Sequence, residues 1–324
     1  MKMRRDKRYS RLACAALAAL MLMCAFLTGC ADGGRKAEDD GRLKIVCTVF
    51  PQYDFIRNIA GDRADVELLI SPGTEVHGYE PAFGDIANIA DCDLLVYVSS
   101  VGEPWVDDAL RSMGAEAPAV CELVGMVQTF DEELVEGMEA DEDEEEGESE
   151  IDEHVWTSPK KAMQITDALC GKLCELDSAN AEYYRANAAL YNEKLAELDR
   201  LFEDAVSSGS RRTVVFAERF PFRYLAEDYG LEYYAAFAGC SSETEPSLAT
   251  ITFLVDKIDA EDIPAVFYIE FSKQTVSDTI SEATGAKPLL MHSCHNLTQE
   301  EAAGGEDYIS LMTRNAANLK EALS

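Results

Sequence analysis

Segments with strand-like and helix-like patterns alternate through both halves of this chain, and no other feature constrains the fold as strongly. The predicted strands lie at 43–50, 66–70, 94–98 and 119–122 and again at 213–217, 232–237, 265–269 and 288–291. The predicted helices lie at 52–60, 84–90 and 105–113 and again at 224–229, 247–259, 275–284 and 309–323. Strands that alternate with helices favour a parallel sheet covered on both faces. We therefore predict an α/β fold in which the second half repeats the first in outline.

Two long helical segments separate the halves. The first runs from Pro159 to Leu176, and the second begins at an Asp-Ser cap signal and spans 177–206. At about 1.5 Å per residue the second helix would reach roughly 40 Å, long enough to join two lobes as a rigid spine. The chain beyond residue 42 also exceeds the size at which one core is usual. We predict an N-terminal lobe at 43–176, a linking helix at 177–206 and a C-terminal lobe at 212–324.

The N-terminus has the pattern of an export signal. Six Lys or Arg side chains lie within 2–11, an uncharged apolar run follows from Leu12 to Leu27, and Thr28-Gly29 precedes Cys30. Small residues before a cysteine mark the processing site of a bacterial lipoprotein, whereas the alternative, an uncleaved N-terminal helix, leaves this motif unexplained. We predict a signal peptide at 1–29, lipidation of Cys30, a tether at 30–42 and anchoring on the extracytoplasmic face of the cell membrane.

The charge of the chain is strongly acidic. The formal net charge is −33, and the stretch 131–153 alone holds fifteen Asp or Glu and no Lys or Arg. Such a charge repels nucleic acids and anionic membrane surfaces, so we expect neither as a partner, and it suits a cationic ligand. The stretch 131–153 is typical of a solvated, disordered loop, with a role in concentrating cations as a secondary hypothesis.

Seven of the ten cysteines lie after Cys30. None has a zinc-finger spacing such as CxxC. Cys240 and Cys294 both lie in polar segments of the second half, and an exported location permits a disulfide between them. Cys47, Cys92, Cys170 and Cys174 fit buried or core positions.

The chain has only four histidines, namely His77, His154, His292 and His295. They follow predicted strands or precede a predicted helix, and in parallel sheets ligand sites collect at the carboxyl ends of the strands. His77, His154 and His292 could converge from two lobes as metal ligands, although a single histidine is more often a hydrogen-bonded structural residue. Catalysis is the other alternative, but no serine elbow, HExxH or phosphate-binding loop accompanies the histidines.

The segment Pro72-Gly73-Thr74-Glu75-Val76-His77-Gly78-Tyr79-Glu80-Pro81 resembles the first histidine motif of the metal-binding lipoproteins of zinc and manganese ABC importers. Asp152-Glu153-His154-Val155-Trp156-Thr157-Ser158-Pro159 resembles their second motif, and Phe222-Arg223-Tyr224, Tyr229-Gly230-Leu231, Glu243-Thr244-Glu245-Pro246-Ser247 and Thr284-Gly285-Ala286-Lys287 extend the likeness over nearly the whole mature chain. The resemblance implies two four-stranded lobes joined by one long helix, with the ion held between them. It also implies delivery of the ion to a membrane permease with a cytoplasmic ATPase, and no enzymatic activity.

The resemblance also implies a ligand set, from which the sequence departs in three places. The third family ligand falls in register on Arg219, which cannot ligate a cation, so its neighbour Glu218 is the candidate and Glu270 the reserve. The fourth, usually an acid, aligns with His292, and His295 is expected to hydrogen-bond beside the site. The histidine-rich loop of zinc members is replaced by the acidic stretch.

The predicted metal ligands are therefore His77, His154, Glu218 and His292. Three imidazoles and one carboxylate favour Zn²⁺ as the transported ion, because Mn²⁺ prefers more oxygen donors. A manganese-binding member of the same family and a zinc-dependent hydrolase of the cell envelope are the alternatives.

Overall fold

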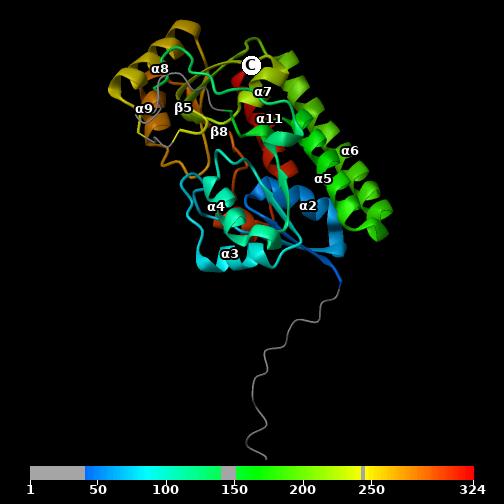
Figure 1. The fold of residues 1–324 in the computed structure, drawn as a ribbon. Helices are drawn as coiled ribbons and strands as arrows, with labels where there is room; N and C mark the ends of the chain where they lie inside the picture. The colour runs from blue at the N-terminus through cyan, green and yellow to red at the C-terminus, as the bar shows by residue number, and fades with distance from the viewer. Residues whose placement is uncertain (1–40, 140–150, 242–244) are drawn as a thin grey trace, which may run out of the picture. The chain divides into compact units, whose positions relative to one another are not determined.

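The computed structural model describes residues 41–139, 151–241 and 245–324, and Leu43–Ser324 forms one unit (Figure 1). The predicted signal peptide, Cys30 and almost all of the predicted tether lie outside the described residues. Among the helices of the described part, none is both long and apolar enough to cross a membrane.

The first sheet is fully parallel and follows the strand order β2-β1-β3-β4. Its strands are β1 (Leu43–Cys47), β2 (Ala64–Leu68), β3 (Leu94–Tyr97) and β4 (Ala119–Glu122). β3 is buried along its whole length, as expected for a central strand covered on both faces. The helices of this lobe are α2 (Phe50–Ala60), α3 (Phe83–Ala90) and α4 (Pro104–Met113).

The second sheet repeats this topology in the order β6-β5-β7-β8, again with all strands parallel. Its strands are β5 (Thr213–Phe220), β6 (Glu232–Ala238), β7 (Ala265–Tyr268) and β8 (Lys287–Leu290). The accompanying helices are α7 (Arg223–Tyr229), α8 (Leu248–Glu261), α9 (Thr275–Thr284), α10 (Gln299–Gly304) and α11 (Tyr308–Ala322). The short helix α10 was not predicted from the sequence, and its capping box from Thr298 to Glu301 is the signal that could have revealed it.

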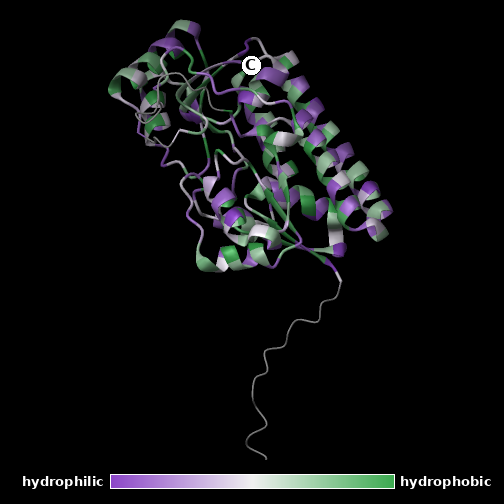
Figure 2. Cartoon of the chain, in the orientation of Figure 1, coloured by the Kyte–Doolittle hydropathy of each residue, from purple (hydrophilic) through white to green (hydrophobic). Residues whose placement is uncertain are grey.

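Two helices run along the side of both lobes, α5 (Pro159–Leu176) and α6 (Ala181–Ser208) (Figure 1). Ser158 caps α5 by accepting a hydrogen bond from the backbone N–H of Lys160, and Pro159 occupies the first turn, where its missing donor costs nothing. α6 packs against α5, α2 and α11 and thus contacts elements from both halves of the chain. Figure 2 shows hydrophobic and hydrophilic residues on both helices, as expected for amphipathic surface helices.

The predicted fold class is confirmed: the chain has two parallel four-stranded sheets flanked by helices, with one long helix between them. The α/β class could be predicted from the periodicity of apolar residues, because each strand and each helix contributes its own apolar pattern. The exact limits of the two lobes remain a prediction.

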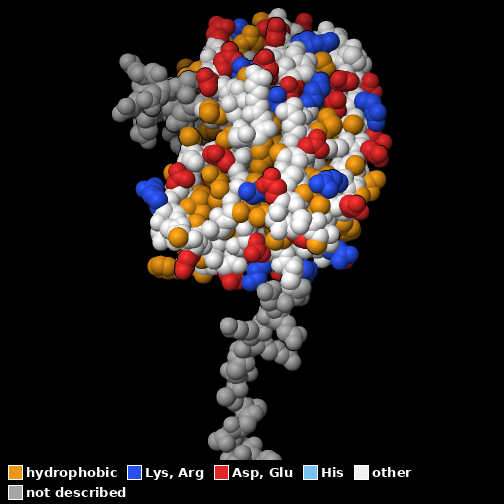
Figure 3. Space-filling model, turned by 45° about the vertical axis from the view of Figure 1, so that its right-hand side comes forward, with side chains coloured by type: hydrophobic (Ala, Val, Ile, Leu, Met, Phe, Trp, Pro, Cys, Tyr) orange, Lys and Arg blue, Asp and Glu red, His pale blue; other side chains and the backbone are white. Residues whose placement is uncertain are grey.

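The acidic stretch differs from the prediction where the structure describes it. Residues 131–139 are not a solvated loop, because Val135 and Met138 pack against the core and Glu139 forms a parallel bridge with Phe237. The Glu139 carboxylate accepts the backbone N–H of Ser247 at 2.7 Å, which ties the segment to the start of α8. Residues 140–150, with eight of the fifteen acids, lie outside the described residues. On the face drawn in Figure 3, acidic and basic side chains are interspersed.

Candidate metal centre

Three histidines lie beyond the ends of the sheet strands, on segments from different parts of the chain. The strand order reverses between β1 and β3 in the first sheet and between β5 and β7 in the second. Such switch points open a crevice at the carboxyl ends of the strands, where ligands of α/β proteins bind. The segments that carry the histidines follow β2, precede α5 and follow β8.

His77 lies on the long connection between β2 and α3. Val76 beside it is buried in the core and anchors the segment. Gly73 has φ +87°, a conformation that favours glycine, and its N–H donates to the carbonyl of Leu297 at 2.7 Å. The connection is thus attached to the segment that follows β8.

His154 lies just before α5 and is buried. Asp152 orients it in two ways, since one carboxylate oxygen accepts the His154 backbone N–H at 2.8 Å and lies 3.2 Å from Nδ1 of the ring. A carboxylate on one ring nitrogen fixes the tautomer and leaves the other nitrogen free to bind a metal. The hydroxyl of Tyr224 donates to the carbonyl of Asp152 at 2.6 Å and holds the segment against α7.

His295 lies on the turn after β8 and is also buried. Its carbonyl accepts the N–H of Phe50 at 3.3 Å, which brings this turn of the second half to the end of β1 in the first. The next residue, Asn296, donates from its side chain to the carbonyls of Ser71 and Thr74, both at 3.0 Å. The His295 turn therefore holds the His77 connection directly.

The three imidazoles face one another. The ring centroids of His77 and His154 are 5.7 Å apart, those of His77 and His295 5.0 Å, and those of His154 and His295 5.3 Å. One nitrogen from each ring lies within 4.8 Å of the other two. Donor atoms around tetrahedral Zn²⁺ are roughly 3.3 Å apart, given a Zn–N bond of about 2.0 Å, so a modest contraction would give a coordination site.

The electrostatics suit ligation by neutral imidazole. Burial, the neighbouring histidines and the positive charge of Arg219 place the pKa of His77 and of His295 well below the ordinary value. For His154, burial opposes the charged form, but the neighbouring carboxylates, that of Asp152 foremost, together outweigh burial and raise the pKa. Because a metal binds only the unprotonated ring, His77 and His295 are ready to accept an ion at neutral pH.

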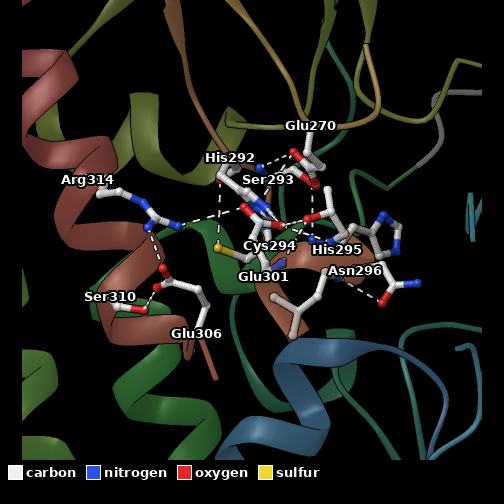
Figure 4. A network of polar contacts seen from close by, with 12 residues as sticks. Glu270, His292, Ser293, Cys294, His295, Asn296, Glu301, Glu306, Ser310 and Arg314 are labelled. Atoms are coloured by element: carbon white, nitrogen blue, oxygen red, sulfur yellow. Dashed lines mark hydrogen bonds and ion pairs between the residues drawn. The ribbon is translucent and has the colours of Figure 1, made fainter. Parts of the chain in front are cut away.

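The structure corrects the predicted set at His292, which does not join the other two histidines. Its Nε2 lies 3.2 Å from a carboxylate oxygen of Glu301, and its Nδ1 accepts the backbone N–H of Cys294 at 2.9 Å (Figure 4). Burial opposes a charge on this ring, but Glu270 and Glu301 outweigh it and raise the pKa of His292. Both nitrogens of the His292 ring are thus engaged by Cys294 and Glu301, away from the other histidines. His295, expected only to hydrogen-bond beside the site, is the histidine that lies close to His77 and His154.

The two predicted carboxylates are also engaged elsewhere. Glu218 accepts hydrogen bonds from the hydroxyl of Ser272 and from the N–H of Ile269. Glu270 accepts both the N–H and the hydroxyl of Ser293 and so supports the turn that carries His295 (Figure 4). Neither belongs to the group of mutually close metal-binding side chains that the described residues form.

The predicted disulfide is wrong. Cys240 and Cys294 are both free thiols, and Cys294 is buried in the turn beside His292. Its Sγ contacts the carbonyl of His292 at 3.8 Å. The sequence could not place the two cysteines, because a pairing depends on Cβ positions and not on local polarity.

Sequence reasoning also missed two residues that shape the centre. One is Asp152, for which the signal is an acid two residues before a histidine, a spacing that lets its carboxylate orient the ring. Trp156 lies 4.9 Å from the ring of His295 and 5.5 Å from that of His154, and its Nε1 donates to the carbonyl of Ser293 at 2.8 Å. Its indole therefore packs against two of the three imidazoles.

Two parallel α/β lobes with a long connecting helix and imidazoles converging at the strand ends define a class of two-lobed binding proteins with a site suited to a metal ion. Comparison with known proteins gives the family. The sequence profile of the family described as "Zinc-uptake complex component A periplasmic" matches residues 45–322. The chain belongs to this family.

Two curated relatives are similar over most of the chain. The zinc-binding lipoprotein AdcA of Streptococcus pneumoniae is 34% identical over 93% of this chain. The matched region covers only 60% of the length of AdcA, which is the longer protein. The high-affinity zinc uptake system protein ZnuA of Bacillus subtilis is 32% identical over 95% of the chain and 96% of its own length.

Solved structures are similar as well. The Zn(II)-bound ZnuA-like domain of Streptococcus pneumoniae AdcA has a TM-score of 0.73 and 33% identity, covering 87% of this chain and 99% of that domain. The metal-dependent lipoprotein YcdH of Bacillus subtilis has a TM-score of 0.74 and 32% identity, covering 87% of this chain and 100% of that one.

Proposed function

We propose that this protein captures Zn²⁺ outside the cytoplasm and delivers it to an ABC importer. The observation that carries the proposal is the convergence of His77, His154 and His295, with a nitrogen of each ring within 4.8 Å of the other two. Three nitrogen donors, two of them buried and one half-buried, suit zinc, whereas manganese prefers more oxygen donors and higher coordination. Family membership and relatives named for zinc binding and zinc uptake support the same ion.

The ligand assignment is tested by titrating zinc into four single variants of the purified protein. Replacing His77, His154 or His295 by Ala is expected to weaken zinc binding at least about tenfold, because each removes one of three donors. His292→Gln is the matched control, since Gln keeps a donor toward Glu301. Loss of zinc binding in His292→Gln, with normal binding in His295→Ala, would restore the assignment made from the sequence.

The identity of the ion is tested by elemental analysis of untagged protein and by competition. We expect purified protein to carry zinc, and a large excess of Mn²⁺ to displace little of it. Displacement of zinc by equimolar Mn²⁺ would favour the manganese alternative.

We further propose that the site binds without catalysing a reaction. The family description names an uptake component, and the relatives are named for zinc binding and uptake. Zinc-loaded protein should hydrolyse ester and peptide substrates no faster than the His295→Ala variant. Zinc-dependent turnover that disappears in that variant would instead support the hydrolase alternative.

The anchor and the partners complete the proposal. The protein is held at the extracytoplasmic face of the membrane by lipid on Cys30 and serves a permease with a cytoplasmic ATPase. When cell extracts are separated by detergent phase partitioning, the Cys30→Ser variant should appear in the aqueous phase and the unmodified protein in the detergent phase. Growth in zinc-depleted medium should require both this chain and the permease.

A further inference from the structure

A metal held by three histidines has one coordination position left to fill. Glu218 and Glu270 bond to groups elsewhere, so the carboxylate expected from the sequence has to come from another residue. Glu153 lies next to His154, and its Oε1 is 3.9 Å from Nδ1 of His77. Like Glu218 and Glu270, Glu153 lies outside the group of three histidines whose ligand atoms are all within 4.8 Å of one another, but its carboxylate lies against one of the three rings.

The carboxylate of Glu153 occupies a defined slot. The hydroxyl of Ser99, just after β3, donates to its Oε2 at 3.2 Å. A Cβ on Gly102 would lie only 1.5 Å from the same oxygen and 2.4 Å from the carboxylate carbon. Position 102 thus has room for the carboxylate because it is glycine. The backbone of Gly102 is not in the left-handed region, so close approach and not conformation is the reason for glycine there.

The negative charge of the Glu153 carboxylate would complement the positive charge of a bound zinc ion. Glu153 is only 5% exposed, and its carboxylate lies against polar groups that include the Ser99 hydroxyl and the His77 ring, a setting in which an added positive charge stabilises it further. Zinc bound to neutral imidazoles keeps its double positive charge, and the Arg219 guanidinium, paired with Glu75 at 3.4 Å, adds another positive charge nearby. Bound zinc and Glu153 would each reduce the cost of burying the other.

We propose that Glu153 is the fourth zinc donor, through the Oε1 that lies beside Nδ1 of His77. This inference rests on the proposed zinc function. It assigns to this chain a carboxylate that comes from the residue adjacent to a histidine ligand, held in place by Ser99 and admitted by Gly102.

The first test compares Glu153→Gln with Glu132→Gln. Glu132 is a matched control, because it is another acid beside this segment, and its carboxylate is engaged by the N–H of Cys240 at 2.7 Å. We expect Glu153→Gln to raise the Kd for zinc about 10- to 100-fold while the metal-free protein melts at the same or a higher temperature. Glu132→Gln should leave the Kd within about twofold.

The second test displaces the carboxylate without removing its charge. Gly102→Ala should push the Glu153 side chain aside and raise the Kd for zinc, and adding Glu153→Gln should raise it little further, since both changes remove the same donor. Gly125→Ala is the control, because nothing lies within 4 Å of a Cβ at Gly125. The absorption spectrum of bound Co²⁺ should change in both Glu153→Gln and Gly102→Ala.

The outcomes separate the two proposals. Unchanged Kd and Co²⁺ spectrum in Glu153→Gln, with zinc binding lost in His295→Ala, would overturn the role of Glu153 and leave the zinc site intact. A fall in melting temperature of metal-free Glu153→Gln that accounts for its weaker binding would also overturn it. Failure of the unmodified protein to bind zinc would instead remove the proposed function itself.

Discussion

At the scale of single residues, buried carboxyl groups around the strand ends of the first lobe are held in unusual states. Glu103 is the strongest example. Burial raises its pKa to about 8, the nearby charge of Glu153 adds to the effect, and a hydrogen bond from the N–H of Val98 offsets part of it. Its second oxygen has no hydrogen-bond partner within the part of the chain that the structure describes, as suits a carboxyl group that keeps its proton.

This state predicts a pH-dependent stability. Between about pH 4.5 and pH 8 the folded protein holds the Glu103 proton more tightly than the unfolded chain, so stability falls as pH rises, by about 1.4 kcal/mol per pH unit from this group. Glu103→Gln should abolish this component. Urea unfolding of the metal-free proteins at pH 5, 6.5 and 8 measures this. The unfolding free energy of the variant should rise relative to that of the unmodified protein as the pH increases. If the unfolding free energies of the two proteins changed with pH in parallel, the raised pKa of Glu103 would be contradicted.

The free thiols give a second prediction at this scale. All seven cysteines of the described residues are free, Cys240 and Cys294 among them. Protein exported into an oxidising medium and then unfolded should react with seven equivalents of alkylating reagent without prior reduction. Cys240→Ser should leave the melting temperature nearly unchanged, whereas loss of a native disulfide would cost about 2–5 kcal/mol.

At the scale of elements, the connections matter more for the centre than the helices and strands do. The turn after β8 reaches the His77 connection through Asn296, which is fully buried and donates to two carbonyls. The same turn is held from the other side by Asn315 of α11, whose side chain accepts the N–H of His292 at 2.8 Å and donates to its carbonyl at 2.7 Å. The positions of His77 and His295 are therefore coupled through hydrogen bonds between asparagine side chains and the backbone.

Asn296→Ala tests this coupling. Two carbonyls in a partly buried contact would lose the donor that the buried Asn296 provides, so we expect a loss of about 1–3 kcal/mol in unfolding free energy together with weaker zinc binding. Asn318→Ala is the matched control, because Asn318 also donates from its side chain to a carbonyl, that of Leu290, but does not reach the His77 connection. It should lower stability without changing the zinc Kd once the folded fraction is equal.

At the scale of the whole molecule, the centre is shared by both halves of the chain. His77 and His154 come from segments before α6, and His295 comes after it. A ligand that binds only the folded state stabilises it, by about 2.7 kcal/mol at a concentration one hundred times its Kd. Because an ion held by these three rings would contact both halves, zinc should stabilise them together, and a single transition at a higher temperature is expected on zinc addition.

The acidic stretch belongs to this scale as well. Substituting the eight acids within 140–150 by Ser and Gly at constant length should leave the zinc Kd unchanged within about twofold at 0.15 M salt, where charges are screened over about 8 Å. Glu139 and the rest of 131–139 are kept, since they pack against the second lobe. A clear rise in Kd at physiological salt would show that these acids contribute to capture.

Local patterns in the sequence determined the fold class of this protein and the positions of two of its three clustered histidines relative to the strands and helices. The alternation of strands and helices fixed the α/β class, because apolar periodicity is a property of neighbouring residues. The placement of His77 and His154 beyond strand ends and before a helix followed from the same alternation, and the structure brings these two rings together.

The tertiary structure decided which other side chains face them. Cys294 has φ +61°, and this reversal of the backbone between His292 and His295 sends one ring toward Glu301 and the other toward His77. The state of the carboxylates and thiols was decided in the same way, since it depends on which distant groups meet each side chain. Sequence spacing sets where a residue stands along the chain, but only the packing of the folded chain sets the direction of its side chain.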